Sequence, residues 1–519
     1  MPNVNGWYHP RDDGTPAHEP IALHLMTRWA VAITLVMLGL HLFAASRLEL
    51  MFDEAYYRLW AQNLQWGYHD HPPAIAAWIR LSTTLFGNSE FGVRALGVIA
   101  TAFGALGVFV ITRDLFDSAH KGALAALIWN AVPLVGVGAI LATPDTPLLF
   151  GWTTALWGLG RLYRTNDWRW WLLIGAAAGI ALQAKYTALF LGPGIALAML
   201  VVPQLRRWWS HPAPYAGGVL ALAIFAPNII WNARNGWETF AKQFGRIGDS
   251  EWTWRFIVDF FGSQIGLLGP LTFVLVVAGF ILAIRGTVDE TNLGGRRLLA
   301  SLCAPLLVYF AFHSLHDRVQ GNWMAPLYPA FAILAADAAW TTITPAASRN
   351  PLLVFARMWA IPAGLTLTGL IYLQALLAPL PLPPRSDPTA LLTGWRQLGR
   401  DLDELATRQD ASYILTQGYA LTGLLKVYGP ASRPVFQFNE RHRWAYEAGS
   451  AKPDSSRPGL FIVELKRAGA AAPLNRFSQA KEIARLERKG RRAVLETYVV
   501  YRLAAPTTEI LDPIGAAKR

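Results

Sequence analysis

The sequence predicts an all-α membrane protein that crosses the bilayer many times and ends in a small α/β domain. Three observations predict this class: a long series of apolar segments, basic clusters that alternate between their connections, and a change of composition after Leu380. Hydrophobic residues make up 53% of the 519 residues and charged residues 15%, against about 25% charged in an average soluble domain. The 22 tryptophans agree with this class, because Trp and Tyr gather at membrane surfaces.

Charge and cysteine content exclude several other classes of protein. The net charge of +12 does not indicate nucleic-acid binding, because the basic residues lie in short clusters between apolar segments. Cys303 is the only cysteine, which excludes an intramolecular disulfide and a cysteine-based metal site. No small-residue cleavage site follows the first apolar segment, so we expect a membrane anchor there and not a removed signal peptide.

Eleven apolar segments approach the roughly 20 residues that a transmembrane helix needs. They are residues 29–45, 92–112, 122–142, 147–162, 170–183, 187–202, 217–231, 265–284, 298–312, 323–340 and 352–377. Because several of them are short, the sequence predicts about 11–13 transmembrane helices.

Basic residues occupy every second connection between these segments. They are Arg113, Lys121, Arg161, Arg164, Arg169, Arg206, Arg207, Arg285, Arg296, Arg297, Arg349 and Arg357. Under the positive-inside rule these connections face the cytoplasm. The external connections are then 46–91, 143–146, 184–186, 232–264, 313–322 and the chain after about 378. We expect a cytoplasmic N-terminus and a C-terminal domain in the periplasm, at the inner membrane of a bacterium.

Two domains follow from this division: a membrane domain over 1–380 and a soluble α/β domain over 385–519, joined by a proline-rich linker. In the second domain the pattern predicts helices at 389–408 and 419–428. It predicts strands at 412–416, 434–438, 460–465 and 494–501. In the external loop 46–91, residues 54–63 and 74–85 are expected to form short helices in the plane of the membrane surface.

The acids Asp53 and Glu54 open this loop directly after the first apolar segment. Ionisable groups at the edge of the hydrocarbon region are costly and usually mark a site. Asp53 is placed where a carboxylate could accept a proton from a substrate that enters from outside. For Glu54, capping of a helix N-terminus is at least as good an interpretation as function.

A second polar group is the run from Tyr68 to Pro73, which contains His69 and His71 on either side of Asp70. Zinc binding by these three neighbours is not expected, since adjacent residues rarely reach one tetrahedral ion together. We expect instead that His69 or His71 donates a hydrogen bond to an anionic group of a substrate. No motif for a resident metal or other cofactor is present in the sequence, although a divalent cation shared by Asp53 and Asp145 is an alternative.

Other candidates lie at the same predicted face. Asp145 either caps the helix that follows it or serves as a second acid of a site. Lys185, followed by Tyr186, either extends to lipid headgroups or binds a substrate phosphate, and Arg94 can be interpreted in the same way. Arg246 and Arg318 are further external cations, and Asn322 and Trp323 form a polar turn that is expected to be either a lid or part of the cavity wall.

The order of these features resembles the GT-C integral-membrane glycosyltransferases. The shared pattern is an acid pair after the first span, tyrosines, a His-Pro-Pro turn, an Arg after Phe-Gly, a Thr-Pro-Asp turn and a Lys-Tyr turn. It is most similar to bacterial relatives of protein O-mannosyltransferases, which include the aminoarabinose and galacturonic acid transferases of lipid A. His71 stands where aminoarabinose transferases have a lysine, which argues against aminoarabinose as the sugar.

The resemblance implies an inverting transfer of a sugar from polyprenyl phosphate to a hydroxyl of an envelope glycan or lipid, at the outer face of the inner membrane. It implies that Asp53 is either the base or an acid that orients the acceptor, and that Asp145 is the second acid of the site. Lys185 would bind the donor phosphate, and Tyr56, Tyr57 and Tyr68 would line the pocket. No metal is implied.

Three alternative functions remain open at this point. A protein O-glycosyltransferase or an oligosaccharide ligase would use the same chemistry on another acceptor. A transporter of a lipid-linked substrate is an alternative from another class, but such proteins usually have internal repeats and ionisable residues near the bilayer midplane. Neither feature is found in this sequence.

Overall fold

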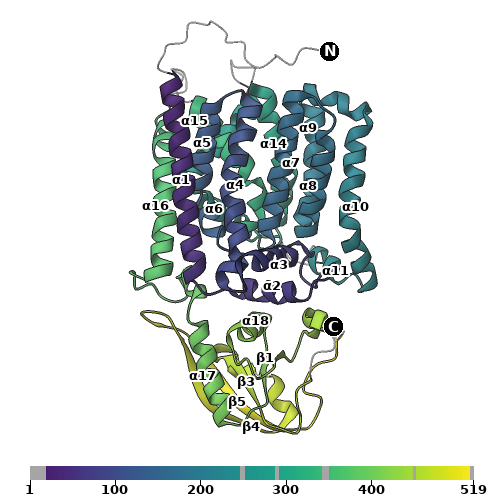
Figure 1. The fold of residues 1–519 in the computed structure, drawn as a ribbon, viewed down its shortest axis with the longest axis vertical. Coiled ribbons are helices and arrows are strands. Elements are labelled where there is room, and N and C mark those ends of the chain that lie inside the picture. The colour runs from purple at the N-terminus through teal and green to yellow at the C-terminus, as the bar shows by residue number, and fades with distance from the viewer. Residues whose placement is uncertain are drawn as a thin grey trace.

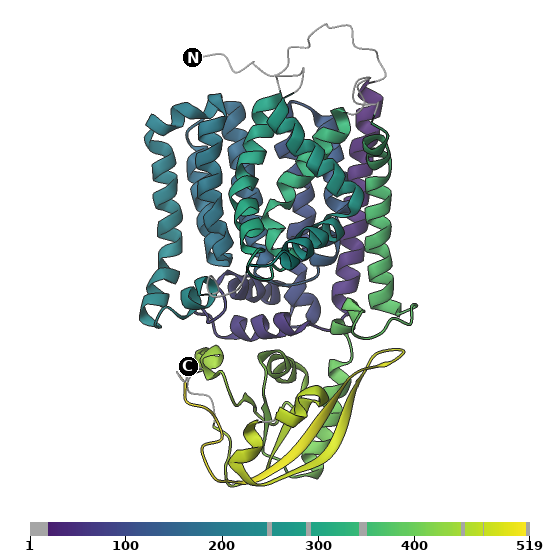
Figure 2. The same ribbon diagram turned by 180° about the vertical axis from the view of Figure 1, so that it is seen from behind.

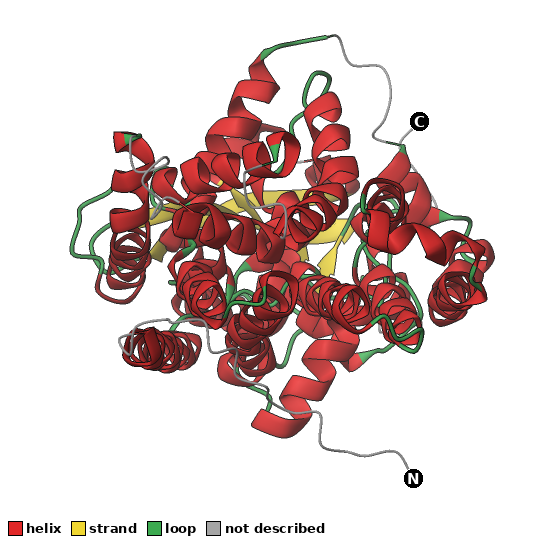
Figure 3. Cartoon of the chain, turned by 90° about the horizontal axis from the view of Figure 1, so that it is seen from above, coloured by secondary structure: helices red, strands yellow, loops and turns green. Residues whose placement is uncertain are grey.

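The computed structural model describes residues 19–245, 252–286, 292–341, 350–447, 452–470 and 472–514. It consists of a bundle of helices and, at one end of the bundle, a smaller domain built around a sheet (Figure 1). Arg246 and Arg349, which the sequence analysis singled out, lie outside the described residues. Seen along the bundle axis, the strands lie behind the helices (Figure 3).

The bundle contains helices α1 to α16. Their bounds are α1 Glu19–Arg47, α2 Phe52–Gln62, α3 Ala74–Phe86, α4 Glu90–Phe116, α5 Ala119–Ala131, α6 Pro133–Gly138, α7 Asp145–Thr165, α8 Trp170–Ala184, α9 Leu191–Val201, α10 Pro212–Arg234, α11 Glu238–Phe244, α12 Arg255–Leu268, α13 Pro270–Arg285, α14 Leu293–His313, α15 Tyr328–Thr341 and α16 Pro351–Leu377. Short 3-10 helices adjoin α9 and α15: η1 Tyr186–Phe190, η2 Pro203–Ser210 and η4 Gly321–Leu327.

The chain is a multi-pass membrane protein. Among the described residues, five helices are long and apolar enough to cross a bilayer, namely α1, α4, α10, α14 and α16. Counting two sharply bent pairs as one span each raises the number to seven. The sequence-based number of 11–13 is larger, because it counted helices of the same bundle that fall short of this length, such as α5, α8 and α15 with 13 to 15 residues.

Two predicted spans are each divided between two helices. Pro133 begins α6, so the segment 122–142 consists of α5 and α6 and not of one helix. Residues 265–284 include the break between α12 and α13, which meet at 107°. Gly269 occupies this break with a φ of +81°, a conformation that suits glycine, and Pro270 starts the next helix.

Buried ion pairs hold the end of the bundle that is remote from the sheet domain (Figure 1). Asp337 binds Lys121 and Arg296 at 2.6 Å each, and all three side chains are almost completely buried. Two of the basic residues that served as orientation signals therefore also join α5, α14 and α15. Asp114 similarly contacts Arg113 and Arg161.

The two short helices predicted over 54–63 and 74–85 are present as α2 and α3. They lie across the end of the bundle that faces the sheet domain, as Figures 1 and 2 show. The two helices share a buried hydrophobic cluster, to which α2 contributes Tyr56, Tyr57 and Trp60 and α3 contributes Ile75 and Ile79. This layer separates the membrane-spanning helices from the C-terminal domain.

The C-terminal domain is a five-stranded sheet with helices packed on it. Its elements are η6 Pro388–Leu392, α17 Trp395–Arg408, β1 Tyr413–Thr416, α18 Tyr419–Tyr428, β2 Val435–Gln437, η7 Arg441–Glu447, β3 Gly459–Glu464, η8 Leu465–Ala470, η9 Ala472–Arg476, β4 Phe477–Lys489 and β5 Val494–Pro506. The strand order is β2-β1-β3-β5-β4, in which β1 pairs in parallel with β2 and β3, and β5 pairs antiparallel with β3 and β4.

Most predicted elements of this domain are present, with two differences. The predicted helix 389–408 is divided by Gly394, whose φ of +85° ends η6 before α17 begins. Strand β4 was not predicted, because its sequence FSQAKEIARLERK has a charge pattern that suits a helix equally well. It forms a strand because it pairs along its length with β5.

Candidate active site

A cavity of about 760 Å³ lies between the end of the bundle and the C-terminal domain. Its wall contains most of the predicted site residues: Asp53, Tyr56, Tyr57, His71, Asp145, Lys185, Tyr186 and Arg318. These residues come from α2, the α2–α3 loop, the start of α7, the α8–α9 connection and the segment before η4. The external connections predicted from the charge pattern therefore meet at one cavity. Asn322 and Trp323 also line its wall.

Asp53 lies in the first turn of α2, where the chain turns from α1 into the surface layer. Tyr419 of α18 donates a hydrogen bond to its Oδ1 at 3.2 Å. Burial raises the pKa of Asp53 to about 6, and the neighbouring charges of Asp70 and Glu54 act in the same direction. A carboxylate with this pKa is ionised at neutral pH and is a better proton acceptor than an ordinary aspartate.

Asp145 is the first residue of α7 but does not cap that helix. Its Oδ1 accepts a hydrogen bond from Nζ of Lys185 at 2.7 Å, and its Oδ2 accepts one from Asn322 at 2.7 Å. Both members of the ion pair are mostly buried, with side-chain exposures of 12% for Lys185 and 15% for Asp145. The capping alternative is thus wrong, and the two predicted residues form one charged pair on the cavity wall.

Glu54 and Arg94 lie apart from the cavity wall, in a buried ion pair with an Oε2–Nη2 distance of 2.6 Å. Arg94 also donates to the backbone oxygens of Leu48 and Glu49. Glu54 accepts from the backbone nitrogens of Met51 and Ala142. The pair joins the α1–α2 connection, α2, α4 and the segment before α7, and its side chains are not part of the cavity wall.

Tyr68 and His69 also lie outside the cavity wall. The Tyr68 ring stacks on Trp60 at 4.1 Å, and its hydroxyl donates to the backbone oxygens of Trp60 and Asn63. The His69 ring lies 4.2 Å from that of His442, and its Nδ1 is 3.6 Å from Glu238. Both residues shape the α2–α3 loop that carries His71.

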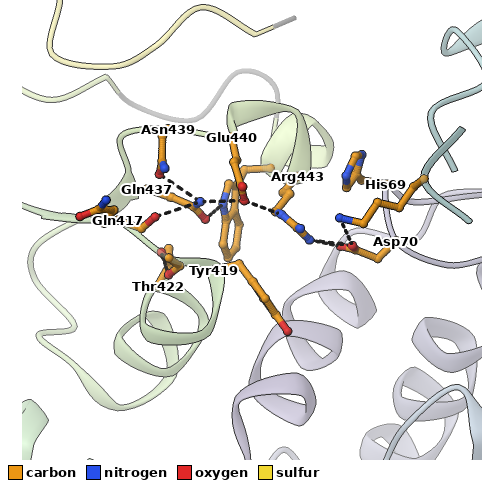
Figure 4. Close-up of polar contacts among 12 residues, drawn as sticks. His69, Asp70, Gln417, Tyr419, Thr422, Gln437, Asn439, Glu440 and Arg443 are labelled. Carbon is orange, nitrogen blue, oxygen red and sulfur yellow. Dashed lines mark hydrogen bonds and ion pairs between the residues drawn. The ribbon is translucent and has the colours of Figure 1, made fainter. Parts of the chain in front are cut away.

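Sequence reasoning missed the contribution of the C-terminal domain to this region. Nη1 of Arg443 donates to both carboxylate oxygens of Asp70 at 2.6 Å. Nε of Arg443 donates to the Glu440 carboxylate at 2.8 Å (Figure 4). Burial alone would raise the pKa of Asp70, but Arg443 and the other cationic neighbours of Asp70 hold this pKa below its usual range.

Within the described ranges, no group of three or more His, Cys, Asp or Glu side chains is arranged to hold a metal ion.

A second, smaller hollow of about 380 Å³, here called the groove, adjoins the cavity and lies between the membrane helices. The two share Asp53, Thr143, Asp145 and Asn322 at one end. The rest of the groove is largely apolar, with side chains such as Phe103, Trp129, Leu149, Phe150 and Trp157. A polar site that opens into an apolar groove suits a substrate with a charged head and a hydrocarbon tail.

Comparisons with known proteins agree with this architecture. The model of the family described as dolichyl-phosphate-mannose-protein mannosyltransferase matches residues 70–231. Two crystal structures of ArnT from Cupriavidus metallidurans, one in the apo state and one bound to undecaprenyl phosphate, superpose with TM-scores of 0.64 and 0.63. Each is 17% identical, and the superposition covers 94% of this chain and 99% of ArnT.

The chain has the GT-C glycosyltransferase fold. The resemblance inferred from the order of motifs is confirmed. The family match includes His71, Asp145 and Lys185, whereas Asp53 and the whole C-terminal domain lie outside it.

Similar sequences include two bacterial proteins that are named as transferases. Lipid A galacturonosyltransferase RgtD of Rhizobium johnstonii is 28% identical over 294 residues, which are 55% of this chain and 60% of that protein. Undecaprenyl phosphate-alpha-4-amino-4-deoxy-L-arabinose arabinosyl transferase 1 of Sodalis glossinidius is 30% identical over 36% of this chain and 32% of that protein. The chain thus matches about three fifths of the length of one relative and one third of the length of the other.

Proposed function

We propose that this protein is an inverting glycosyltransferase. It moves a sugar from a polyprenyl-phosphate donor to a hydroxyl of an envelope lipid or glycan of the lipopolysaccharide type. The reaction takes place at the periplasmic face of a bacterial inner membrane, with the N-terminus in the cytoplasm and the C-terminal domain in the periplasm. The observation that carries the proposal is the continuity of a polar cavity, containing Asp53 and Lys185, with an apolar groove between membrane helices.

The geometry supports a specific division of roles. The polyprenyl tail lies in the apolar groove and its phosphate lies beside Lys185, whose ammonium group is a good point-charge partner for phosphate. The acceptor oxygen attacks the anomeric carbon while Asp53 takes its proton, and the bond from that carbon to the phosphate oxygen breaks. The electron pair leaves with polyprenyl phosphate, and Lys185 stabilises the charge that develops there. Asp145 holds Lys185 in place.

The relatives support the class of donor and acceptor. ArnT was solved with undecaprenyl phosphate, and two similar proteins are named for galacturonic acid transfer to lipid A and for transfer of aminoarabinose from undecaprenyl phosphate. The apolar groove of this chain offers the same kind of donor a place to bind.

The direct test uses the purified full-length protein in nanodiscs with radiolabelled polyprenyl-phosphate sugars and an envelope lipid extract. We expect label to move to an acceptor lipid. We also expect polyprenyl phosphate to be released only when donor and acceptor are both present. Label in added protein would favour a protein O-glycosyltransferase. Movement of intact donor across vesicle membranes, without cleavage of the sugar–phosphate bond, would overturn the proposal in favour of a transporter.

The activity is expected to fall as the pH drops through about 6. The base must be ionised, and burial raises the pKa of Asp53 to about this value, so kcat/KM rises with pH below it and levels off above it. The measurement is kcat/KM between pH 4.5 and 8.5, with samples preincubated at each pH and then assayed at pH 7.5 to exclude irreversible loss. A kcat/KM that stays constant from pH 8.5 down to about pH 5 would mean that an ordinary exposed carboxyl, and not Asp53, controls the reaction.

Replacing Lys185 by glutamine is expected to lower kcat/KM for the donor by about 10- to 100-fold, because a charged contact to the phosphate is lost. Lys185→Arg, which keeps the charge, is expected to retain more activity than Lys185→Gln. Steady-state kinetics at varied donor concentration measures both variants. Equal losses of activity in the two variants would mean that Lys185 acts through its ion pair with Asp145 and not through a contact with the donor phosphate.

A further inference from the structure

The C-terminal domain contacts the cavity through the first turn of α18. This helix packs directly on α2: Ala55 lies in one buried cluster with Leu421, Leu424 and Leu425. A Cβ atom added to Gly423 would lie only 3.4 Å from the backbone nitrogen of Tyr56. The two helices are therefore in close contact, and Asp53 lies two residues from Ala55.

Tyr419, the first residue of α18, belongs to the cavity wall. Its ring contacts Phe52 and Tyr56, with centroid distances of 6.2 and 5.4 Å. Its hydroxyl donates to Oδ1 of Asp53 at 3.2 Å. In the part of the chain that the structure describes, this is the only side-chain hydrogen bond to the Asp53 carboxylate.

The position of the Tyr419 ring is fixed by charges from both domains. The guanidinium of Arg443 lies 4.8 Å from the ring centroid, a distance typical of a cation–π contact. Arg443 is itself held by Asp70 on one side and Glu440 on the other (Figure 4). Tyr56 completes this arrangement, because its hydroxyl donates to Asp70 at 3.1 Å.

We propose that Tyr419 is a positioning residue for Asp53, supplied to the active site by the C-terminal domain. The inference rests on the proposed function, in which Asp53 is the base. The Tyr419 hydroxyl fixes one carboxylate oxygen and so directs the other toward the acceptor hydroxyl. Arg443 acts one step further away, because it holds the ring of Tyr419 and not the carboxylate.

The arrangement has a measurable consequence for proton transfer. A hydrogen bond to the charged form of a carboxyl stabilises that form, so loss of the Tyr419 hydroxyl raises the pKa of Asp53 further. The charged groups that face Asp53 are Glu54 on the same helix, Asp70 in the α2–α3 loop and Arg443 in η7. The Asp145–Lys185 pair lies on the wall of the same cavity.

The test compares Tyr419→Phe with Tyr428→Phe in the full-length protein. Tyr428 lies at the other end of α18, and its hydroxyl donates to Glu90 at 3.0 Å across the same domain interface, but it is not part of the cavity wall. We expect Tyr419→Phe to move the acidic limb of kcat/KM upward by about one pH unit, the effect of one hydrogen bond to a charged group. Tyr428→Phe is expected to leave the limb in place.

A second measurement does not depend on activity. Carbodiimides react with protonated carboxyl groups, so the pH dependence of Asp53 labelling, quantified by mass spectrometry of its peptide, reports the protonation of this residue directly. We expect its midpoint to shift upward in Tyr419→Phe and not in Tyr428→Phe. Unchanged midpoints in Tyr419→Phe, or equal shifts in both variants, would overturn the inference. Absence of sugar transfer by the wild type would instead overturn the proposed function, while labelling would still test the contact.

Discussion

Replacing Asp53 by asparagine is expected to lower the rate of sugar transfer by about 100- to 10,000-fold, the usual contribution of a general base. Asparagine has nearly the same shape but cannot take the proton of the acceptor hydroxyl. Because the Tyr419 hydroxyl can still donate to the asparagine side-chain oxygen, the fold of the cavity is expected to remain. The measurement is single-turnover transfer from a radiolabelled donor in nanodiscs.

The matched control is Asp259→Asn, the same substitution at an exposed acid of α12. This variant is expected to transfer sugar at the wild-type rate. If Asp53→Asn remains within about threefold of wild type and Asp145→Asn loses activity, the base is Asp145 and the roles proposed for the two acids must be exchanged.

Replacing Arg94 by methionine is expected to destabilise the protein by about 3–5 kcal/mol, because Glu54 then keeps a buried charge without a partner. Four segments lose a common contact at the same time, since Arg94 also binds the backbone oxygens of Leu48 and Glu49. To measure this, samples in detergent are heated at a series of temperatures. Size-exclusion chromatography then gives the fraction of protein that remains monodisperse at each temperature.

Two further variants identify the cause. Arg80→Met makes the same change at an exposed residue of α3 and is expected to behave like wild type. The double variant Glu54→Gln, Arg94→Met removes both charges, so it is expected to recover part of the lost stability. A double variant that is no more stable than Arg94→Met would show that packing, and not the unpaired charge, accounts for the loss.

The part of the site that sequence could predict consists of charged residues where charge is unusual. Asp53, Asp145 and Lys185 each follow or precede an apolar segment, and the alternation of basic clusters assigned all three to one face. The cavity brings these same three residues together. Charged residues are rare next to apolar segments, and basic residues occur in every second connection between these segments. Both signals can be recognised in a single sequence.

The contacts that sequence could not predict join residues far apart in the chain. Nothing in the sequence pairs Glu54 with Arg94, so helix capping, lipid headgroups and substrate were the partners considered for them, and their contact with each other was not predicted. Arg443 and Tyr419 lie more than 360 residues from their partners Asp70 and Asp53. Strand β4 was missed for a related reason, because only its pairing with β5 distinguishes it from a helix.

The strand order of the C-terminal domain has a consequence for the biosynthesis of the protein. β5 is the last strand of the described sheet but lies between β3 and β4, so β4 has no partner within this sheet until β5, which begins at Val494, has started to leave the ribosome. All the membrane helices are translated before this point. The domain that carries Tyr419 is therefore completed only after β5 has been synthesised, and a nascent chain that has not reached β5 does not yet contain the finished wall of the cavity.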